Sequence, residues 1–382
     1  MKPLTLNNFR FAPLYAGLLL GVVIAFNLGV VSVPYYQRLA DAFIHGRLDV
    51  STNDTTDLAP FNGRYYYPDG PLPSILMTPL VAMLGIDAPI ALVALVGNLG
   101  VFYMCFLLAR RFDYSLVDAC WFTLAFCFGT SFIGVIYLSW SFSHGLTVLC
   151  LFLAIAEYEN KRRLALVGFL IGLAMTSHAP AGLNIIFFAL AVLLGAGRIG
   201  DKSADLAKLL LPFTFIVGSL ALYNFARFGS PLESGYSYQI NGFGLPYADW
   251  NVPGNIAGPA VSLANIPTNL WTFLFGLPEA AAIGSSVFLL SPFAVYLATL
   301  RRWDMTNTLI VVNVVLVLAA VLAFRSTGFE QVGYRFSLDF LPFIFWLAVR
   351  SRLRVTPELR ALIFFATLID LGLVCYFQAT RI

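Results

Sequence analysis

Two aspartates near the start of the chain have the spacing and surroundings of a proton acceptor. Asp54 and Asp57 lie three residues apart in the polar segment STNDTTD, directly before the aromatic run LAPFNGRYYYP. A partly buried carboxylate beside tyrosines has a tunable pKa and can remove the proton of a hydroxyl group. The same side chains could instead cap an Asx-type turn, or together hold a divalent cation. The residues alone leave these three interpretations open.

A second group of candidates lies far downstream, in the segment GFEQVGYRFSLDFLPF. Arg335 offers a guanidinium suited to bidentate phosphate binding, and Tyr334 offers a hydroxyl donor. Arg64, close to the two aspartates, is a further cation. Arg335 and Asp339, four residues apart, could instead form an ion pair with a purely structural role. We therefore expect either an anion site or an ion pair here.

Polar side chains inside apolar surroundings complete the candidates. His144 lies in the segment LSWSFSHGL, and an ionisable group at such a place is either functional or hydrogen-bonded to a neighbouring helix. The three histidines of the chain do not have the spacing of a known metal motif. Tyr65, Tyr66, Glu233 and Tyr236 combine aromatic rings with an acidic group, a combination that suits a sugar. The segment YYYPDGPLP around Asp69 has the sequence of a turn.

The elements that must position these residues are membrane helices. Hydrophobic residues make up 59% of the chain and charged residues 11%, and the mean hydropathy is +0.81. Soluble domains carry about 25% charged residues, so this composition excludes a soluble protein. Strand-like alternation is absent, which favours helices over a barrel. We predict an all-α polytopic membrane protein of one domain, residues 1–382, without a separate soluble domain.

Eleven apolar stretches are candidates for spans of the bilayer. The first follows Lys2 and Arg10 and is too long for a signal peptide, so we expect a retained anchor. The five cysteines lie in apolar segments and are expected to be packing residues. The predicted spans are 12–31, 89–109, 116–137, 142–157, 164–177, 181–196, 207–225, 283–300, 306–324, 337–349 and 360–378.

The distribution of positive charge predicts the orientation of these spans. With a cytoplasmic N-terminus, most of the 23 Lys and Arg residues fall on the cytoplasmic side. The long loops 32–88 and 226–282, and the shorter 325–336, then lie outside the membrane. Long loops of this kind are usually functional. Their apolar pieces, 72–84 and 266–277, are expected to lie at the membrane surface.

The order of these segments resembles a known family. The pieces LADAFIHGRLDV, DLAPFNGRYYYPDGPLPSILMTPLVAMLG, GLAMTSHAP, YNFARFGSPLESGYSYQ, NIPTNLWTFLFGLPE and GYRFSLDFLPF are similar to the GT-C class of membrane glycosyltransferases. The resemblance is to the bacterial group of protein mannosyltransferases and aminoarabinose transferases, and it covers most of the chain.

The resemblance implies a sugar donor on a polyprenyl phosphate in the cytoplasmic (inner) membrane. A glycan or lipid acceptor would enter from the extracytoplasmic face, and an aspartate of the first outer loop would act as general base of an inverting transfer. Relatives often carry this aspartate in an acidic pair directly after the first span, where this chain has Val31, Ser32 and Val33. The expected base is therefore Asp57, with Asp54 second.

The remaining candidates take their expected roles from the same resemblance. Arg335, Tyr334, Arg64 and His144 would bind the donor phosphate, and Tyr65, Tyr66, Glu233 and Tyr236 would bind the sugar or the acceptor. No metal ligand is assigned, although a divalent ion is compatible with the two aspartates, and no nucleic acid partner is expected. A flippase or transporter for lipid-linked sugars, or an inactive member of the family, is the alternative. A transporter would carry charges inside several spans, as Asp370 does in the last one.

Overall fold

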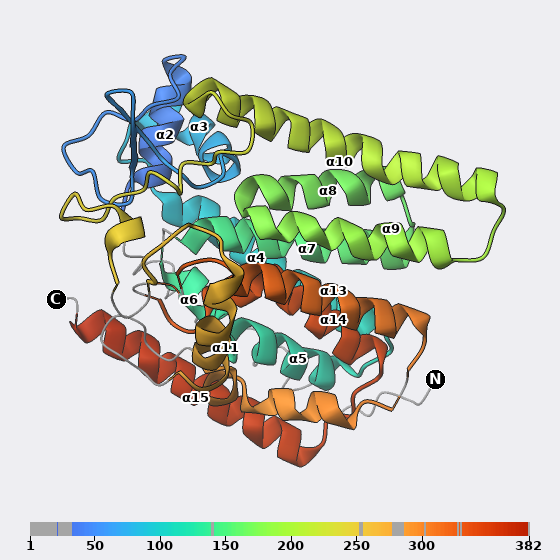
Figure 1. The fold of residues 1–382 in the computed structure, drawn as a ribbon. Coiled ribbons are helices and arrows are strands. Elements are labelled where there is room, and N and C mark those ends of the chain that lie inside the picture. Colours follow the sequence, from blue (N-terminus) through green and yellow to red (C-terminus); the bar gives the residue numbers. More distant parts are fainter. Residues whose placement is uncertain are drawn as a thin grey trace.

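The computed structural model describes residue 21 and residues 33–138, 141–251, 255–276, 286–301, 303–326, 328 and 331–380. The regular secondary structure of the described part is helical apart from one two-stranded antiparallel sheet and three isolated bridges (Figure 1). The sheet pairs β1 (Ala59–Phe61) with β2 (Arg64–Tyr66). The α-helices are α2 Tyr35–Ile44, α3 Leu72–Leu84, α4 Ile90–Arg111, α5 Leu116–Phe128, α6 Phe132–Tyr137, α7 Phe142–Asn160, α8 Leu164–Ser177, α9 Ile185–Leu194, α10 Ile199–Phe228, α11 Ile266–Phe275, α12 Val287–Leu290, α13 Met305–Leu322, α14 Leu341–Arg350 and α15 Pro357–Thr380.

Short 3-10 helices complete the described chain. They are η3 Ala179–Asn184, η4 Tyr247–Asp249, η5 Leu263–Asn265, η6 Pro292–Thr299 and η7 Arg335–Asp339.

Five helices are long and apolar enough to cross a membrane. They are α4, α7, α10, α13 and the apolar part of α15, and each contains or overlaps one predicted span. A mainly helical fold with helices able to cross a membrane is therefore confirmed, whereas the small sheet was not predicted and the count of eleven spans stays a prediction. The predicted span 12–31 lies outside the described residues except for Gly21.

Several predicted spans are not single regular helices. The stretch 116–137 divides into α5 and α6 around Gly129, whose carbonyl oxygen accepts a hydrogen bond from Ser291 Oγ at 2.6 Å. In its described part, the stretch 283–300 consists of α12 and η6, because Pro292 removes a backbone donor at the start of η6. The stretch 337–349 likewise starts in η7 before α14 begins.

The apolar pieces of the long loops form helices of their own. The piece 72–84 is α3, with Pro71 directly before it and Pro73 in its first turn, where a missing backbone donor is tolerated. It packs against α2, which buries Tyr36, Leu39 and Ala40 on one face. The piece 266–277 contains α11.

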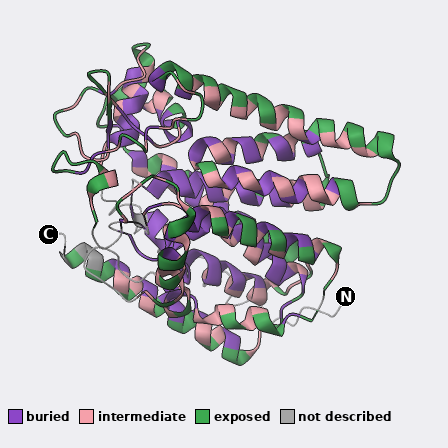
Figure 2. Ribbon diagram, viewed as in Figure 1, coloured by how far each residue is buried: buried purple, intermediate pink, exposed green. Residues whose placement is uncertain are grey.

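Helices α7 and α8 lie at the centre of the bundle, and α10 lies along its outside (Figures 1 and 2). Side chains of α10 such as Leu211, Phe215 and Leu222 are exposed, as expected of a surface that faces lipid. Its other side approaches α8 closely, because a Cβ at Gly168 would collide with the carbonyl oxygen of Leu209.

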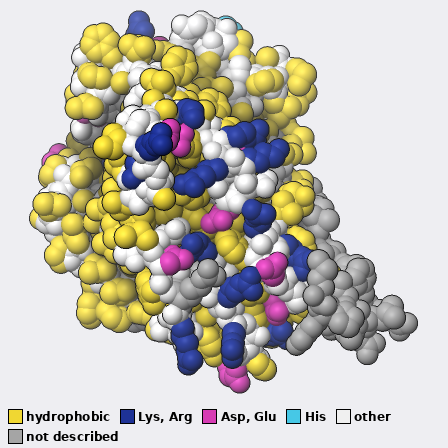
Figure 3. Space-filling view, turned by 90° about the vertical axis from the view of Figure 1, so that its right-hand side faces the viewer, with side chains coloured by type: hydrophobic (Ala, Val, Ile, Leu, Met, Phe, Trp, Pro, Cys, Tyr) yellow, Lys and Arg dark blue, Asp and Glu magenta, His cyan; other side chains and the backbone are white. Residues whose placement is uncertain are grey.

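Lys and Arg side chains gather at one end of the bundle, which Figure 3 shows facing the viewer. Helix α4 ends there with Arg110 and Arg111, and α14 ends with Arg350. Helix α7 runs from His144, near its first residue, to Lys161, which follows its last. The two ends of the bundle therefore differ in chemistry, and His144 belongs to the end away from the basic face.

Candidate active site

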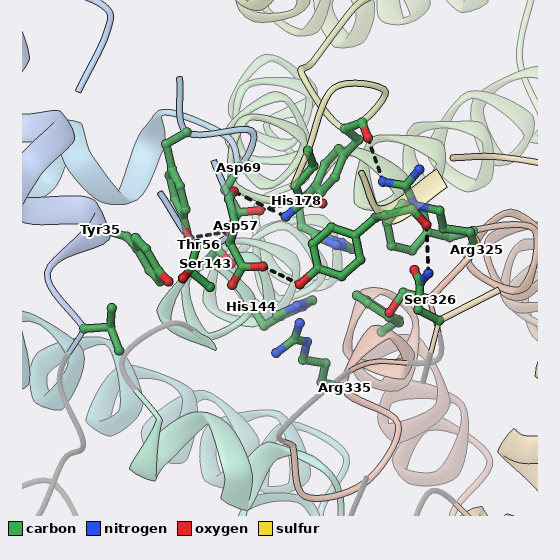
Figure 4. Close-up of a pocket in the computed structure, with 18 residues that line it drawn as sticks. Tyr35, Thr56, Asp57, Asp69, Ser143, His144, His178, Arg325, Ser326 and Arg335 are labelled. Atoms are coloured by element: carbon green, nitrogen blue, oxygen red, sulfur yellow. Dashed lines mark hydrogen bonds between the residues drawn. The ribbon is translucent and has the colours of Figure 1, made fainter. Parts of the chain in front are cut away.

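A cavity of 210 Å³ lies where the loops 32–88 and 226–262 meet the ends of the bundle helices. Its walls come from the first loop, the start of α7, the end of α8, the second loop, and the segment between α13 and α14 (Figure 4). Segments far apart in sequence thus contribute to one site. Of the predicted site residues, Asp57, His144, Tyr236 and Arg335 line it.

Asp57 is half-buried, and its carboxylate oxygen Oδ1 accepts a 2.6 Å hydrogen bond from the hydroxyl of Tyr247. Burial raises the pKa of Asp57 above its ordinary value, because the charged form loses hydration. The hydrogen bond from Tyr247 and the positive charge of Arg335 act in the opposite direction. The carboxylate is therefore more basic than an exposed aspartate while remaining hydrogen-bonded.

The second loop fixes the backbone of Asp57. The residue has a φ of 62°, a left-handed conformation that Asp tolerates better than most residues. The N–H of Asp57 donates to the carbonyl oxygen of Ile240 at 3.0 Å. The carbonyl oxygen of Asp57 accepts a hydrogen bond from Gln239 Nε2 at 3.3 Å. These contacts hold the carboxylate toward the cavity.

A second carboxylate, Asp69, also lines the cavity but is surrounded by hydroxyl donors. Its Oδ2 accepts from Tyr67 at 3.0 Å and from Tyr36 at 3.3 Å, and its Oδ1 accepts from Tyr236. Burial and the charge of Asp69 raise the pKa of Tyr67 and Tyr236, so these hydroxyls stay protonated and donate. The next residue, Gly70, allows a close approach, since a Cβ there would collide with the carbonyl oxygen of Thr176.

Two arginines border the cavity in different ways. Arg325 is buried and donates to the carbonyl oxygen of Tyr236 at 2.8 Å, so it supports the second loop. Arg335 makes no hydrogen bond or ion pair with any residue that the structure describes, and its guanidinium lies over the ring of Phe336 at 5.4 Å. Arg335 can therefore donate to an anion in the cavity.

The alternative role of Arg335, an ion pair with Asp339, is wrong in this structure. Asp339 is fully buried and its Oδ2 lies 2.7 Å from Nδ1 of His178. The two residues belong to a 3-10 helix, which has three residues per turn, so positions four apart do not face the same side.

Six predicted site residues lie outside the walls of this cavity. Asp54 is exposed, and its Oδ1 accepts from the backbone N–H of Thr56 at 3.1 Å, as in the alternative turn interpretation. Arg64 is exposed and lies 3.4 Å from Asp49. Both side chains interact with neighbouring residues of the first loop, so neither is positioned to act in the cavity.

The other four are held by packing or by local hydrogen bonds. Tyr334 lies in the core, where its hydroxyl donates to the carbonyl oxygen of Val321 at 3.3 Å, which corrects the expected phosphate contact. Tyr66 packs edge-on against Phe228. Tyr65 packs against a core cluster at the base of the first loop, and Glu233 Oε1 accepts from the N–H of Gly235 at 2.7 Å.

Sequence reasoning did not assign Asp69, Tyr247, Arg325 or His178 to the site. The first was interpreted as a turn residue, and the tyrosine lies in a loop without a recognisable motif. The clustering of aromatic residues around Pro-Asp-Gly was the available signal for Asp69. A contact such as that between Tyr247 and Asp57 depends on how the two loops pack together, which no local pattern encodes.

No protein-family model matches the chain, and no curated protein matches it by sequence. Among solved structures it is similar to ArnT from Cupriavidus metallidurans, at 12% identity. The form bound to undecaprenyl phosphate gives a TM-score of 0.54 over 95% of this chain and 63% of that chain. The apo form gives 0.52 over 91% and 60%.

At this identity the likeness concerns the fold. This chain spans somewhat less than two thirds of the length of ArnT, and almost all of it takes part in the superposition. The fold that the sequence resemblance implied is confirmed: the chain has the fold of ArnT, an aminoarabinose transferase of the GT-C type.

Proposed function

We propose that this protein is a membrane glycosyltransferase that moves a sugar from a polyprenyl-phosphate carrier to a hydroxyl of a glycan or lipid acceptor. The observation that carries the proposal is that Asp57 and Arg335 border one cavity in a chain with the fold of ArnT. A crystal structure of ArnT contains undecaprenyl phosphate, which supports a carrier of the same class here.

The proposed reaction is a single displacement at the anomeric carbon of the sugar. The carboxylate of Asp57 removes the proton of the acceptor hydroxyl, and the hydroxyl oxygen forms a bond to C1. The bond between C1 and the phosphate oxygen breaks, and its electron pair leaves with the phosphate. Attack on the face opposite the phosphate inverts the configuration at C1.

The electrostatics of the cavity support this assignment of roles. Burial raises the pKa of Asp57, which makes its carboxylate a stronger base than an exposed aspartate. Asp69 is less suited to the task, because three tyrosine hydroxyls already donate to its oxygens. The guanidinium of Arg335, which has no hydrogen bond or ion pair within the described part of the chain, would stabilise the negative charge that develops on the leaving phosphate.

The sidedness of the chain supports an extracytoplasmic site. The basic residues at the ends of α4, α7 and α14 favour a cytoplasmic location for that end of the bundle. The cavity lies with the opposite ends of α7 and α14, and the exposed apolar side chains of α10 suit contact with lipid. A lipid carrier held in the outer leaflet would thus reach the cavity from the membrane.

A donor-consumption assay tests the proposal directly. Purified full-length protein is incubated with a radiolabelled undecaprenyl-phosphate sugar and an envelope lipid or glycan fraction. The expected result is release of undecaprenyl phosphate together with label in the acceptor. If the donor stays intact but crosses the bilayer of reconstituted vesicles, the protein is a transporter and the proposal is wrong.

A further inference from the structure

Three side chains with metal-binding chemistry converge beside the cavity. His144 comes from the first turn of α7, His178 from the residue that ends α8, and Asp339 from the end of η7. One ligand atom of each lies within 4.8 Å of the others. The two imidazole rings lie 4.4 Å apart between centroids, and both histidines line the cavity.

Two atoms of this group are buried without a partner among the described residues. His144 is 4% exposed and Asp339 is 0% exposed. Nδ1 of His144 and Oδ1 of Asp339 make no hydrogen bond with any of these described residues. A buried nitrogen and a buried carboxylate oxygen in this state have lost hydration without compensation, which is costly. A bound cation, to which both the nitrogen and the oxygen donate an electron pair, would remove this cost.

We propose that His144, His178 and Asp339 bind a divalent transition-metal ion of the Zn²⁺ class. Imidazole nitrogen together with carboxylate oxygen favours Zn²⁺ and its first-row neighbours over Mg²⁺ or Ca²⁺, which prefer ligand sets made of oxygen. Three protein ligands leave a further coordination position. Because both histidines line the cavity, a ligand in the cavity would be able to take that position.

The surroundings of the three residues would orient such ligands. Nδ1 of His178 lies 2.7 Å from Oδ2 of Asp339, so these two side chains are already held together, and an ion bound by both would replace this hydrogen bond. The ring of Phe336 stacks on that of His178 at 5.8 Å. Asn184 Nδ2 donates to the carbonyl oxygen of Asp339 at 3.0 Å, which holds the end of η7.

The charges explain what the ion would do. Two neutral histidines and one carboxylate bring a single negative charge, so the loaded group would carry a net charge of about +1 by this arithmetic. Arg335, which lies next to His144 in Figure 4, opposes binding of the cation, while the carboxylates of Asp57 and Asp69 favour it. Together the ion and Arg335 would form an anion site for a phosphate oxygen. This last step rests on the proposed function, whereas metal binding does not.

Equilibrium metal binding tests the site without any sugar donor. Full-length protein in detergent is stripped with a chelator, dialysed against Zn²⁺, and its metal content is measured by mass spectrometry. We expect one equivalent of Zn²⁺ for the wild type, and an affinity at least about tenfold lower for His144→Ala and for His178→Ala. His45→Ala is the matched control, because His45 is exposed and lies in α2's C-terminal cap. The site is rejected if both variants bind as the wild type does.

Cobalt gives a readout that does not depend on how well the variants fold. Co²⁺ added to the stripped wild type should produce visible absorption bands of a low-coordinate site, which Zn²⁺ then displaces. Absence of saturable Co²⁺ and Zn²⁺ binding in the wild type overturns the proposal, and sugar transfer by the same stripped protein would leave the proposed function intact.

The phosphate contact is tested separately with undecaprenyl phosphate. Its affinity should be at least about tenfold higher for the Zn²⁺-loaded protein than for the stripped protein, because the ion adds a charge-assisted contact to a phosphate oxygen. Equal affinities would overturn the phosphate contact while the metal site itself stands.

Discussion

The hydroxyl of Tyr247 donates a 2.6 Å hydrogen bond to Oδ1 of Asp57, although 190 positions separate the two residues. Asp57 belongs to the first long loop and Tyr247 to the second, so this bond joins the two loops over the cavity. The raised pKa of Tyr247, which follows from burial and from the charge of Asp57, keeps the hydroxyl protonated. The basicity of Asp57 therefore depends on the second loop.

Replacing Asp57 with Asn should lower the rate of sugar transfer by about 10²- to 10⁴-fold, the usual contribution of a general base. The amide keeps the size of the side chain but cannot accept the proton. The measurement is release of undecaprenyl phosphate by purified protein. Asp54→Asn, which changes an exposed side chain outside the cavity walls, should keep the wild-type rate. The opposite ranking would make Asp54 the base.

Replacing Tyr247 with Phe should move the acidic limb of the pH–rate profile to higher pH. The hydrogen bond from Tyr247 lowers the pKa of Asp57, so its loss adds to the increase that burial causes. A general base works only when deprotonated, and a higher pKa makes activity fall at a higher pH as the solution is acidified. The measurement is kcat/KM as a function of pH for the variant and the wild type. An unchanged acidic limb would contradict the role of Asp57.

Replacing Arg335 with Ala should weaken binding of undecaprenyl phosphate by about 10-fold or more, because a charge-assisted hydrogen bond is worth about 1.5–3 kcal/mol. Lys at this position keeps the charge but not the forked geometry, so it should restore binding in part. The affinity is measured by titration of the purified protein. Arg64→Ala is the matched control, since Arg64 is exposed and pairs with Asp49. Equal losses in both variants would indicate a general effect of surface charge.

Replacing Tyr334 with Phe should leave sugar transfer unchanged. Its hydroxyl donates to the carbonyl oxygen of Val321, inside a cluster with Phe336 and Phe340. Loss of one such hydrogen bond costs about 0.5–1.5 kcal/mol of stability. Thermal unfolding of the purified protein should show a small decrease in melting temperature. A large loss of transfer with normal stability would restore the phosphate contact that the sequence suggested.

The sequence was sufficient to predict the class of fold, because the lengths of the apolar stretches and the positions of the charges are read directly from the order of the residues. It located the helices of the long loops as well, since α3 and α11 fall on the apolar pieces of otherwise polar intervals. Breaks such as the one at Gly129 were not predicted. They depend on contacts from elsewhere in the chain, here the hydrogen bond from Ser291.

His144 and Arg335 stand out in the sequence against apolar surroundings, and both line the cavity, while their roles stay predictions. A residue's place in the cavity could not be predicted where it depends on a distant partner. Asp54 and Asp57 are residues of the same type in the same segment. They differ in their contacts with the second loop, because Ile240 and Tyr247 form hydrogen bonds with Asp57. Tyr334 and Arg335 are neighbours in sequence, yet one lies in the core and the other borders the cavity.

Replacing Asp69 with Ala should destabilise the protein strongly. The hydroxyls of Tyr67 and Tyr236 would lose their acceptor and that of Tyr36 would lose one of its contacts, and Tyr36 and Tyr67 are 0% and 4% exposed. An unsatisfied buried hydroxyl costs about 1–3 kcal/mol, so we expect a loss of at least about 2 kcal/mol in the free energy of unfolding.

The corresponding Asp69→Asn variant separates this structural role from a catalytic one. Its amide oxygen still accepts from the hydroxyls, so the melting temperature should fall less than in the alanine variant. Asp49→Ala, which removes only the 3.4 Å contact with exposed Arg64, should have a small effect, as exposed ion pairs contribute about 0–1 kcal/mol. If Asp69→Ala melts at the same temperature as Asp49→Ala, the three hydroxyls find other partners and Asp69 does not hold the loops together.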